Sequence, residues 1–163
     1  MNTKIKYALL DRDGTLIFEP QDTYQIDSIE KLKLLDGVIE GLQFLQSNNF
    51  HLIMISNQDG LGTDSFPKED FDTPQNAMLK IFSDNNIHFE EVFVCPHLPE
   101  DNCTCRKPKT GLLDDWLKTA DIDTKQSFVC GDRVTDSELA KNLGLTYVPI
   151  PTNGNFYEAI KKL

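Results

Sequence analysis

The chain has little positive charge. Its 163 residues include 16 Lys and Arg against 26 Asp and Glu, which gives a formal net charge of −10. A surface of this sign repels nucleic acid and anionic lipid, so it disfavours both a nonspecific nucleic-acid binder and a polynucleotide substrate. Any phosphate that binds must therefore meet a local cluster of donors or a metal ion.

Long apolar segments are also missing. The apolar runs fall well short of a membrane span, and residues 1–7 carry no apolar region of the kind found in signal peptides. We find no internal repeat, low-complexity tract or domain linker. We therefore expect one cytoplasmic domain over residues 1–163, with no membrane contact and with a core of its own.

Cysteine is scarce, and its distribution is uneven. Three of the four cysteines, Cys95, Cys103 and Cys105, gather around His97, whereas Cys130 lies in an apolar run and is expected to be a buried core residue. Two disulfides in a secreted chain are the alternative, but this spacing favours a cytosolic zinc site. Three thiolates and one imidazole complete a tetrahedral set, which indicates a structural ion rather than a catalytic one.

The zinc loop leads directly into a pair of cations. Arg106 and Lys107 follow the last ligand, Cys105, without a gap. We therefore expect the ion to fix the backbone that carries these two side chains, and we expect its removal to impair activity indirectly.

Apolar runs alternate with amphipathic segments along the chain. This order predicts an α/β fold with a parallel, doubly wound sheet. The expected strands cover residues 5–10, 52–55, 92–94 and 127–130, with a short one near 147–148; the expected helices begin near residues 38, 73, 112 and 135, with a last one at the C-terminal end. Residues 18–35 and 58–73 lack a clear pattern and are expected to be loops over the site.

Two helix starts carry explicit signals. Thr73-Pro74 suits an N-cap followed by the first helical position, with an apolar face behind it formed by Ala77, Met78, Ile81 and Phe82. The segment 135–138 has the pattern of a capping box, and Gly144 is expected to end that helix. On this interpretation Asp136 belongs to the helix turn rather than to the site.

Polar residues follow three of the expected strands. Asp11 and Asp13 follow the first, Ser56-Asn57 the second and Asp132 the fourth, while the third leads through the zinc loop to the two cations. In a doubly wound sheet, ligands bind beyond the carboxyl ends of the strands. We therefore expect these groups to share one crevice.

The paired carboxylates suggest phosphoryl chemistry. Asp11 and Asp13 flank one residue, so on an extended chain their side chains point the same way and need a divalent cation between them. Oxygen ligands and a phosphoryl substrate favour Mg²⁺, with Asp132 as a further ligand. Asp11 can then attack phosphorus, and Asp13 can protonate the leaving oxygen and later deprotonate water.

The remaining residues of this set match the needs of a phosphoryl group. Ser56 and Asn57 can donate hydrogen bonds to its oxygens, Lys107 can neutralise them, and Gly14 lets backbone N–H groups approach. Each feature alone has an ordinary alternative, because strand-end Asp residues often cap helices and single Lys residues are usually solvated. The combination, in this order and at the strand ends, is what carries the hypothesis.

With these residues, the chain resembles the haloacid dehalogenase superfamily of aspartate-nucleophile phosphatases over its whole length. Residues 11–15 resemble its first motif, 56–58 the second, Lys107 the third, and 131–133 with Asp136 the fourth. The zinc loop followed by Arg-Lys-Pro narrows the resemblance to the branch that contains histidinol-phosphate phosphatases and heptose bisphosphate phosphatases. Residues 57–63, 65–67, 70–71 and 95–99 resemble the former, since the heptose enzymes typically have a serine after the Asn-Gln pair.

The resemblance implies a sheet without a large cap domain and hydrolysis of a small phosphomonoester, L-histidinol phosphate. It implies Asp11 as nucleophile, Asp13 as general acid and base, and Mg²⁺ held by Asp11, the backbone carbonyl of Asp13 and Asp132. Zinc would be held by the four ligands named above. Glu19 and Asp22 are candidate partners for the amine of the substrate, and Arg106 is a candidate phosphate contact.

Several alternatives stay open. The substrate can instead be a sugar phosphate such as D-glycero-D-manno-heptose 1,7-bisphosphate, or the chain can be a zinc-stabilised protein that binds phosphorylated ligands without hydrolysing them. The resemblance is to the N-terminal half of bifunctional histidine-biosynthesis enzymes. A stand-alone phosphatase and a part of a longer chain with a dehydratase domain are therefore both open, as a monomer or a small homo-oligomer.

Overall fold

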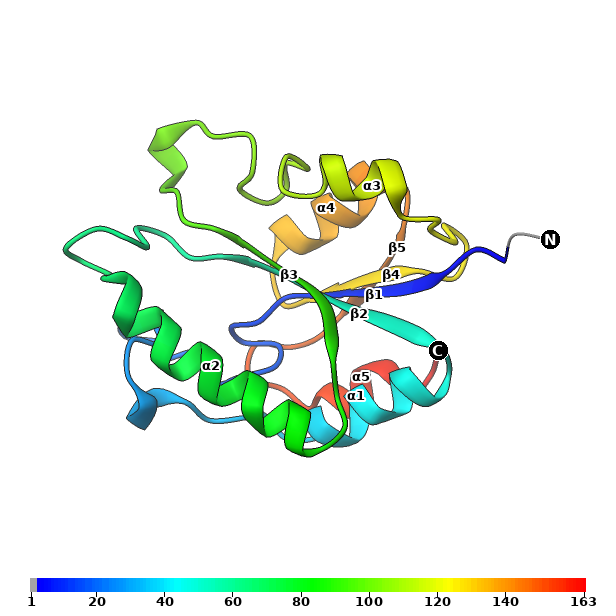
Figure 1. Ribbon diagram of the computed structural model, residues 1–163, viewed down its shortest axis with the longest axis horizontal. Helices are drawn as coiled ribbons and strands as arrows, with labels where there is room; N and C mark the ends of the chain where they lie inside the picture. The colour runs from blue at the N-terminus through cyan, green and yellow to red at the C-terminus, as the bar shows by residue number, and fades with distance from the viewer. Residues whose placement is uncertain (1–2) are drawn as a thin grey trace.

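A five-stranded parallel sheet forms the centre of the computed structural model, which describes residues 3–163 (Figure 1). The strand order is β3-β2-β1-β4-β5, with β1 in the middle. Helices α1, α2 and α5 cover one face of the sheet, and α3 and α4 cover the other. The predicted α/β fold with a doubly wound parallel sheet is confirmed.

The strands and helices have these bounds: β1 Lys6–Leu10, α1 Val38–Ser47, β2 Phe50–Asn57, α2 Lys68–Asp84, β3 Phe89–Cys95, α3 Asp114–Thr119, β4 Phe128–Gly131, α4 Val134–Leu143, β5 Thr146–Pro149 and α5 Phe156–Ile160. Two short 3₁₀ helices, Ile29–Lys31 and Pro99–Asp101, lie in the connections. Within residues 3–163 these connections form loops rather than a large cap domain. In the same part of the chain, no helix has the length and apolar character needed to cross a membrane.

The central strand supplies both faces of the sheet with apolar side chains. Ala8 and Leu10 point into the core under α1, α2 and α5, whereas Tyr7 and Leu9 point into the core under α3 and α4. A parallel strand that is buried on both faces reads as a continuous apolar run, which is why residues 5–10 were recognisable as a strand. The chain leaves this core abruptly at Asp11.

The start of α2 differs from the prediction. The helix begins at Lys68, after Pro67, so Thr73 and Pro74 lie inside it. Pro67 marks this start because a proline disfavours the helical conformation in the residue before it. The acidic residues Glu69 and Asp70 complement the positive end of the helix dipole in the first turn. The loop predicted to extend to residue 73 therefore ends at residue 67.

The buried face of α2 is correspondingly rotated. Phe71, Gln75, Met78 and Phe82 are buried, at the spacing of one helical face, whereas the predicted core residue Ile81 is 37% exposed. The predicted helix began at residue 73 and so omitted residues 68–72. Phe71 lies in that omitted part and belongs to the buried face.

The start of α4 also lies earlier than predicted. Arg133 is its N-cap residue, and Asp136 at the third helical position accepts a hydrogen bond from the backbone N–H of Arg133 at 3.2 Å. The capping box predicted at 135–138 is therefore wrong. Gly144 ends the helix in a left-handed conformation (φ +71°), as predicted.

Candidate functional site

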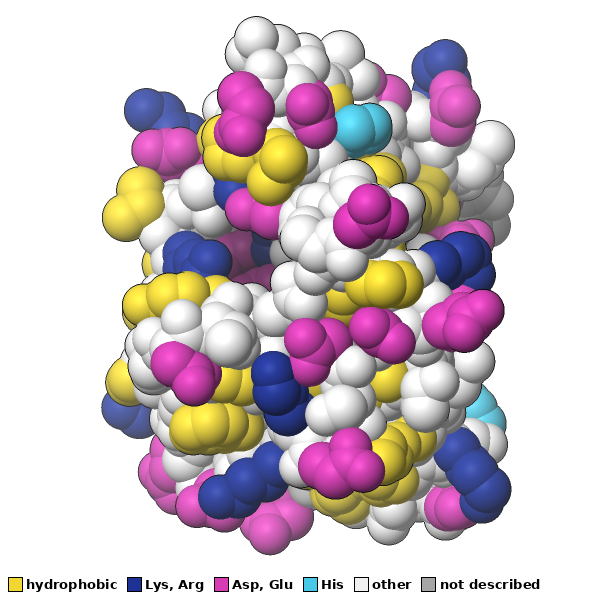
Figure 2. Space-filling view, turned by 90° about the vertical axis from the view of Figure 1, so that its left-hand side faces the viewer, with side chains coloured by type: hydrophobic (Ala, Val, Ile, Leu, Met, Phe, Trp, Pro, Cys, Tyr) yellow, Lys and Arg dark blue, Asp and Glu magenta, His cyan; other side chains and the backbone are white. Residues whose placement is uncertain are grey.

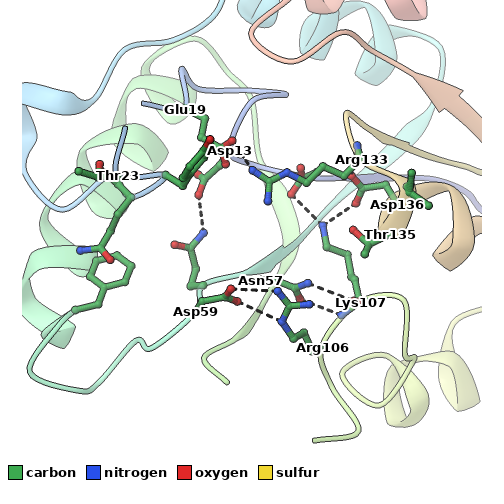
Figure 3. A pocket seen from close by; sticks show the side chains of 16 residues that line it. Asp13, Glu19, Thr23, Asn57, Asp59, Arg106, Lys107, Arg133, Thr135 and Asp136 are labelled. Atoms are coloured by element: carbon green, nitrogen blue, oxygen red, sulfur yellow. Dashed lines mark hydrogen bonds and ion pairs between the residues drawn. The ribbon is translucent and has the colours of Figure 1, made fainter. Parts of the chain in front are cut away.

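A cavity of about 420 Å³ opens beyond the carboxyl ends of the strands. Figure 2 looks onto this end of the molecule and shows a hollow with acidic and basic side chains inside it. Its lining combines loop residues after β1 and β2 with residues that follow the zinc loop and β4. The residues that line it are Asp11, Asp13, Glu19, Thr23, Tyr24, Gln25, Asn57, Gln58, Asp59, Phe66, Arg106, Lys107, Arg133, Val134, Thr135 and Asp136 (Figure 3).

Lys107 forms the charged centre of this cavity. Its Nζ donates to Asp11 Oδ1 at 2.9 Å, to Asp136 Oδ1 at 2.8 Å and to the carbonyl oxygen of Ile55 at 3.0 Å. Burial alone would lower the pKa of Lys107, but the two carboxylates outweigh it and raise this pKa above its ordinary value. The ammonium group is therefore a fixed positive charge beside Asp11.

Asp136 belongs to the site as well as to its helix. One of its oxygens caps α4 and the other accepts from Lys107, while only 1% of its surface is exposed. The prediction that it serves only the helix turn is therefore wrong. Because a short Asp at the third helical position points back toward the strand end, one carboxylate can fill both roles.

Three carboxylates form a cluster at the strand ends. Oxygens of Asp11, Asp132 and Asp136 lie within 4.8 Å of one another. Burial and the neighbouring Asp11 raise the pKa of Asp132 to about 7 and the pKa of Asp136 to about 6. Such a group of hard oxygen donors is suited to a divalent cation such as Mg²⁺, which would neutralise the repulsion.

Asp13 lies apart from this cluster. Its Oδ1 accepts a hydrogen bond from Arg12 Nε at 2.6 Å, and its Oδ2 accepts one from Gln58 Nε2 at 3.0 Å. The predicted side-by-side arrangement of the Asp11 and Asp13 carboxylates around one ion is therefore not found. Asp13 instead forms the wall of the cavity opposite Lys107 (Figure 3).

Two glycines make room for the carboxylates. A Cβ at Gly14, which has a φ of +80°, would lie 2.6 Å from Asp132 Oδ2, and one at Gly131 would lie 2.1 Å from Asp136 Oδ2. The backbone N–H of Gly14 donates to the carbonyl oxygen of Ile17 at 2.8 Å. Gly14 therefore accommodates a carboxylate, and its own N–H is engaged with Ile17. That this glycine lets backbone N–H groups approach a phosphate stays a prediction.

Replacement of Gly131 by Ala tests this close approach. The new methyl group must displace the Asp136 carboxylate from Lys107, so we expect a loss of unfolding free energy of about 1–3 kcal/mol. Urea unfolding measures this loss. An unchanged stability would contradict the tight packing of this glycine against Asp136.

Asn57 holds the backbone of Lys107. Its Oδ1 accepts from the backbone N–H of Lys107 at 2.9 Å, and its Nδ2 donates to the carbonyl oxygen of Lys107 at 3.4 Å. Ser56 is buried, accepts from Gln58 Nε2 at 2.7 Å and does not line the cavity. Arg106 forms an ion pair with Asp59 at 3.1 Å. These three residues, predicted as phosphate contacts, therefore all have partners within the protein.

Glu19 lines the cavity from the loop that follows β1. Only 3% of its surface is exposed, and its carboxylate pairs with the guanidinium of Arg133. Burial raises the pKa of Glu19 despite the opposing effect of Arg133. Asp22, the other predicted partner of a substrate amine, is exposed and does not line the cavity.

Asn153 fixes Glu19 in place, and sequence reasoning missed it. Its Oδ1 accepts from the backbone N–H of Glu19 at 2.8 Å, and its Nδ2 donates to the carbonyl oxygen of Glu19 at 3.1 Å. Arg133 was also missed as a partner of Glu19. Its position directly after Asp132 at a strand end was the available signal.

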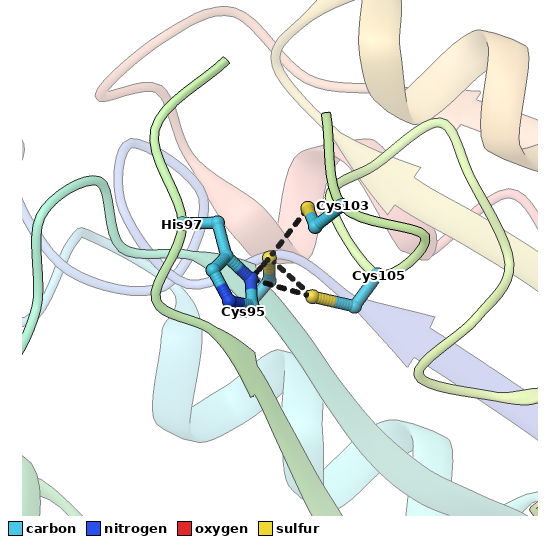
Figure 4. A group of neighbouring side chains, drawn as sticks. All are labelled: Cys95, His97, Cys103 and Cys105. Atoms are coloured by element: carbon cyan, nitrogen blue, oxygen red, sulfur yellow. Dashed lines mark hydrogen bonds between the residues drawn. The ribbon is translucent and has the colours of Figure 1, made fainter. Parts of the chain in front are cut away.

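The four predicted zinc ligands come together at the end of β3 (Figure 4). Cys95 Sγ lies 3.5 Å from His97 Nδ1, 3.7 Å from Cys103 Sγ and 2.6 Å from Cys105 Sγ, and His97 Nδ1 lies 3.1 Å from Cys105 Sγ. Three sulfur atoms and one imidazole nitrogen fit the donor set of a structural zinc ion. Because Arg106 follows directly, the cluster lies next to the Arg106–Asp59 ion pair.

A family model described as "Polynucleotide kinase 3 phosphatase" matches residues 6–152. The chain belongs to this family. Among its relatives are proteins named "Histidine biosynthesis bifunctional protein HisB". The one from Baumannia cicadellinicola is 52% identical over 155 residues, which cover 95% of this chain and 44% of that protein, and the one from Actinobacillus pleuropneumoniae is 56% identical over 136 residues, which cover 83% and 37%. The chain thus spans less than half the length of these relatives.

Two solved structures of proteins described as phosphatases share the fold of this chain. D,D-heptose 1,7-bisphosphate phosphatase from B. bronchiseptica, complexed with magnesium and phosphate, has a TM-score of 0.80 and 24% identity, with 98% of this chain and 87% of that chain covered. A HAD-like phosphatase from Mesorhizobium loti, described as putative, has a TM-score of 0.76 and 20% identity, with 88% and 71% covered. These structures share the fold that the resemblance of the motifs implied.

Proposed function

We propose that this chain is a phosphomonoesterase that hydrolyses L-histidinol phosphate to L-histidinol and inorganic phosphate, a step of histidine biosynthesis. One observation carries the chemistry. A buried lysine neutralises Asp11 at the end of the central strand, inside a cavity with further carboxylates. The names of the relatives, which are about half identical to this chain, support the choice of substrate.

The proposed reaction has two steps. A carboxylate oxygen of Asp11 forms a bond to phosphorus while the bond from phosphorus to the ester oxygen breaks, and Asp13 gives its proton to that leaving oxygen. Water then forms a bond to phosphorus and gives a proton to Asp13, while the bond from phosphorus to Asp11 breaks and phosphate leaves. Lys107 neutralises the phosphoryl oxygens in both steps.

Two metal ions belong to the proposal. Mg²⁺, held by Asp11, Asp132 and the backbone carbonyl of Asp13, would offset the negative charge of the carboxylates and the phosphoryl group. Zinc, held by the Cys-His cluster, would fix the loop that precedes Arg106 and Lys107. The carboxylate cluster and the four converging sulfur and nitrogen ligands support these two assignments.

Loss of the zinc ion is expected to slow the enzyme without removing any group that touches the substrate. In Cys103→Ser we expect zinc content to fall and kcat to drop by up to about 10²-fold, because a displaced Lys107 misplaces the charge it supplies. Elemental analysis and steady-state kinetics measure the two. Cys130→Ala, which alters a cysteine outside the cluster, is the control. A zinc-free Cys103→Ser protein with normal kcat would refute the positioning role.

Glu19 is the proposed partner of the substrate amine. Its side chain is buried and lines the cavity together with Asp13. An amine that is cationic at neutral pH would interact favourably with its carboxylate. A heptose bisphosphate lacks such an amine, so the ratio of kcat/KM for the two substrates decides between L-histidinol phosphate and the sugar phosphate.

The alternative of a binding protein predicts no turnover. Mg²⁺-dependent release of phosphate from L-histidinol phosphate supports an enzyme, whereas binding without release supports the alternative. A polynucleotide substrate stays disfavoured despite the family name, because a net charge of −10 offers no basic track. We further propose a single phosphatase domain over residues 1–163 in the cytoplasm, as a monomer or small homo-oligomer or joined to a dehydratase domain in a longer chain.

A further inference from the structure

Both carboxylate oxygens of Asp13 are held by donors. Arg12 Nε donates to Oδ1 at 2.6 Å and Gln58 Nε2 donates to Oδ2 at 3.0 Å. The orientation of the Gln58 amide is fixed from the other side, because its Oε1 accepts from Arg12 Nη2 at 3.3 Å and its Nε2 also donates to Ser56 Oγ at 2.7 Å. A flipped amide would place its oxygen against the carboxylate of Asp13.

The guanidinium of Arg12 connects this pair to helix α2. Arg12 is completely buried, its Nη1 donates to Gln75 Oε1 at 2.9 Å, and its guanidinium lies 4.8 Å from the centre of the Phe71 ring. A buried arginine is tolerated when its charge and its donors are matched, and this network matches them. The Asp13 carboxylate is therefore fixed by its own loop, by the end of β2 and, through Arg12, by α2.

The network leaves the position of Asp13 independent of the Lys107 cluster. Asp13 and Lys107 lie on opposite sides of the cavity (Figure 3), and the two side-chain donors to Asp13 are Arg12 and Gln58. Each carboxyl oxygen keeps acceptor capacity whether or not the group carries a proton. The contacts to Arg12 and Gln58 can therefore persist while a proton passes between Asp13 and a group in the cavity.

We propose that Gln58 is a positioning residue: together with Arg12, it holds the Asp13 carboxyl group where it meets the leaving oxygen of the substrate. This inference rests on the proposed function, in which the proton of Asp13 passes to the leaving oxygen as the ester bond breaks. Without the Gln58 donor, Oδ2 of Asp13 loses its restraint and the carboxyl group can rotate. Proton transfer to the leaving oxygen then slows, while the nucleophile and Lys107 keep their arrangement.

The dependence on the leaving group isolates this role. An alkyl phosphate such as L-histidinol phosphate needs protonation of its leaving oxygen, whereas the nitrophenolate of p-nitrophenyl phosphate leaves as an anion. We compare kcat/KM for both esters, because this quantity reports the steps up to release of the leaving group. The contribution of general acid catalysis, about 10²–10⁴-fold, sets the ceiling for the loss.

Two variants separate the donor from the packing. Gln58→Glu keeps the size of the side chain and an acceptor for Arg12, but it has no N–H for Asp13; Gln58→Leu removes both polar groups. In each we expect kcat/KM for the alkyl ester to fall about 10-fold to 100-fold, against less than about 3-fold for the aryl ester. Gln43→Leu, the same change at an exposed position of α1, should alter neither value.

The possible outcomes are distinct. Equal losses for both esters would mean that Gln58 supports the fold or the phosphate site, and no loss for either would mean that Asp13 needs no help; each result would overturn the inference. Should Gln58→Leu fail to fold, Gln58→Glu alone gives the comparison. A wild-type protein that hydrolyses neither ester would overturn the proposed function itself, and with it the role of Gln58.

Discussion

Replacement of Asp11 by Asn is expected to reduce phosphate release by about 10⁴-fold or more, the range seen when a covalent nucleophile is removed. The amide keeps the size of the side chain and an oxygen that can accept from Lys107 Nζ, but it is a poor nucleophile toward phosphorus. The measurement is release of phosphate from L-histidinol phosphate in the presence of Mg²⁺, with intact mass to exclude deamidation. Asp84→Asn, on the exposed side of α2, is the control.

The same variant is expected to keep its fold. Asp11 acts to raise the pKa values of both Asp132 and Asp136, which shows that its charge is repelled by theirs. Removing that charge should leave the thermal unfolding temperature unchanged or higher in the absence of Mg²⁺. An appreciable residual rate in a protein of the correct mass would mean that Asp11 is not the nucleophile, and a lowered unfolding temperature would contradict the repulsion.

Replacement of Lys107 by Met is expected to cost both stability and activity. The ammonium group is almost fully buried between Asp11 and Asp136, so its loss leaves two buried carboxylates without their cation. Removal of one partner from a buried ion pair typically costs about 3–5 kcal/mol of unfolding free energy. Urea unfolding measures the stability, and phosphate release is expected to become undetectable because the phosphoryl oxygens lose their fixed charge.

A second substitution sharpens this prediction. Asp136→Asn in the Lys107→Met background removes one of the stranded charges, so it should recover part of the lost stability. Lys80→Met breaks an exposed ion pair with Asp84 and should change the unfolding free energy by no more than about 1 kcal/mol. If Lys107→Met lowered the unfolding free energy as little as Lys80→Met, the pairing of Lys107 with the two carboxylates would not stabilise the fold.

The strand-end residues could be located from the sequence because two simple rules coincide. Buried parallel strands appear as apolar runs, and ligands bind where such strands end. Asp11, Asn57, Lys107 and Asp132 all lie at or near the cavity edge of the sheet as expected. The Cys-His cluster could be located for a similar reason, since its spacing is local and the loop is short.

Helix registers and side-chain partners were less accessible. The start of α2 was missed although Pro67 and the acidic first turn mark it locally. The position of α4 is set by Asp136, which reaches both Lys107 and its own helix end. Arg106 pairs with Asp59, a residue 47 positions away. Such pairings depend on how distant loops meet, and a single sequence states the residue types without stating which of them meet.

The stereochemical course at phosphorus tests the two-step reaction most directly. A phosphate ester made chiral at phosphorus with sulfur and oxygen isotopes is hydrolysed in isotopically labelled water, and the configuration of the product is determined. Two successive displacements, first by Asp11 and then by water, predict net retention of configuration. Net inversion would mean that water attacks the substrate directly, and it would contradict a phosphorylated Asp11.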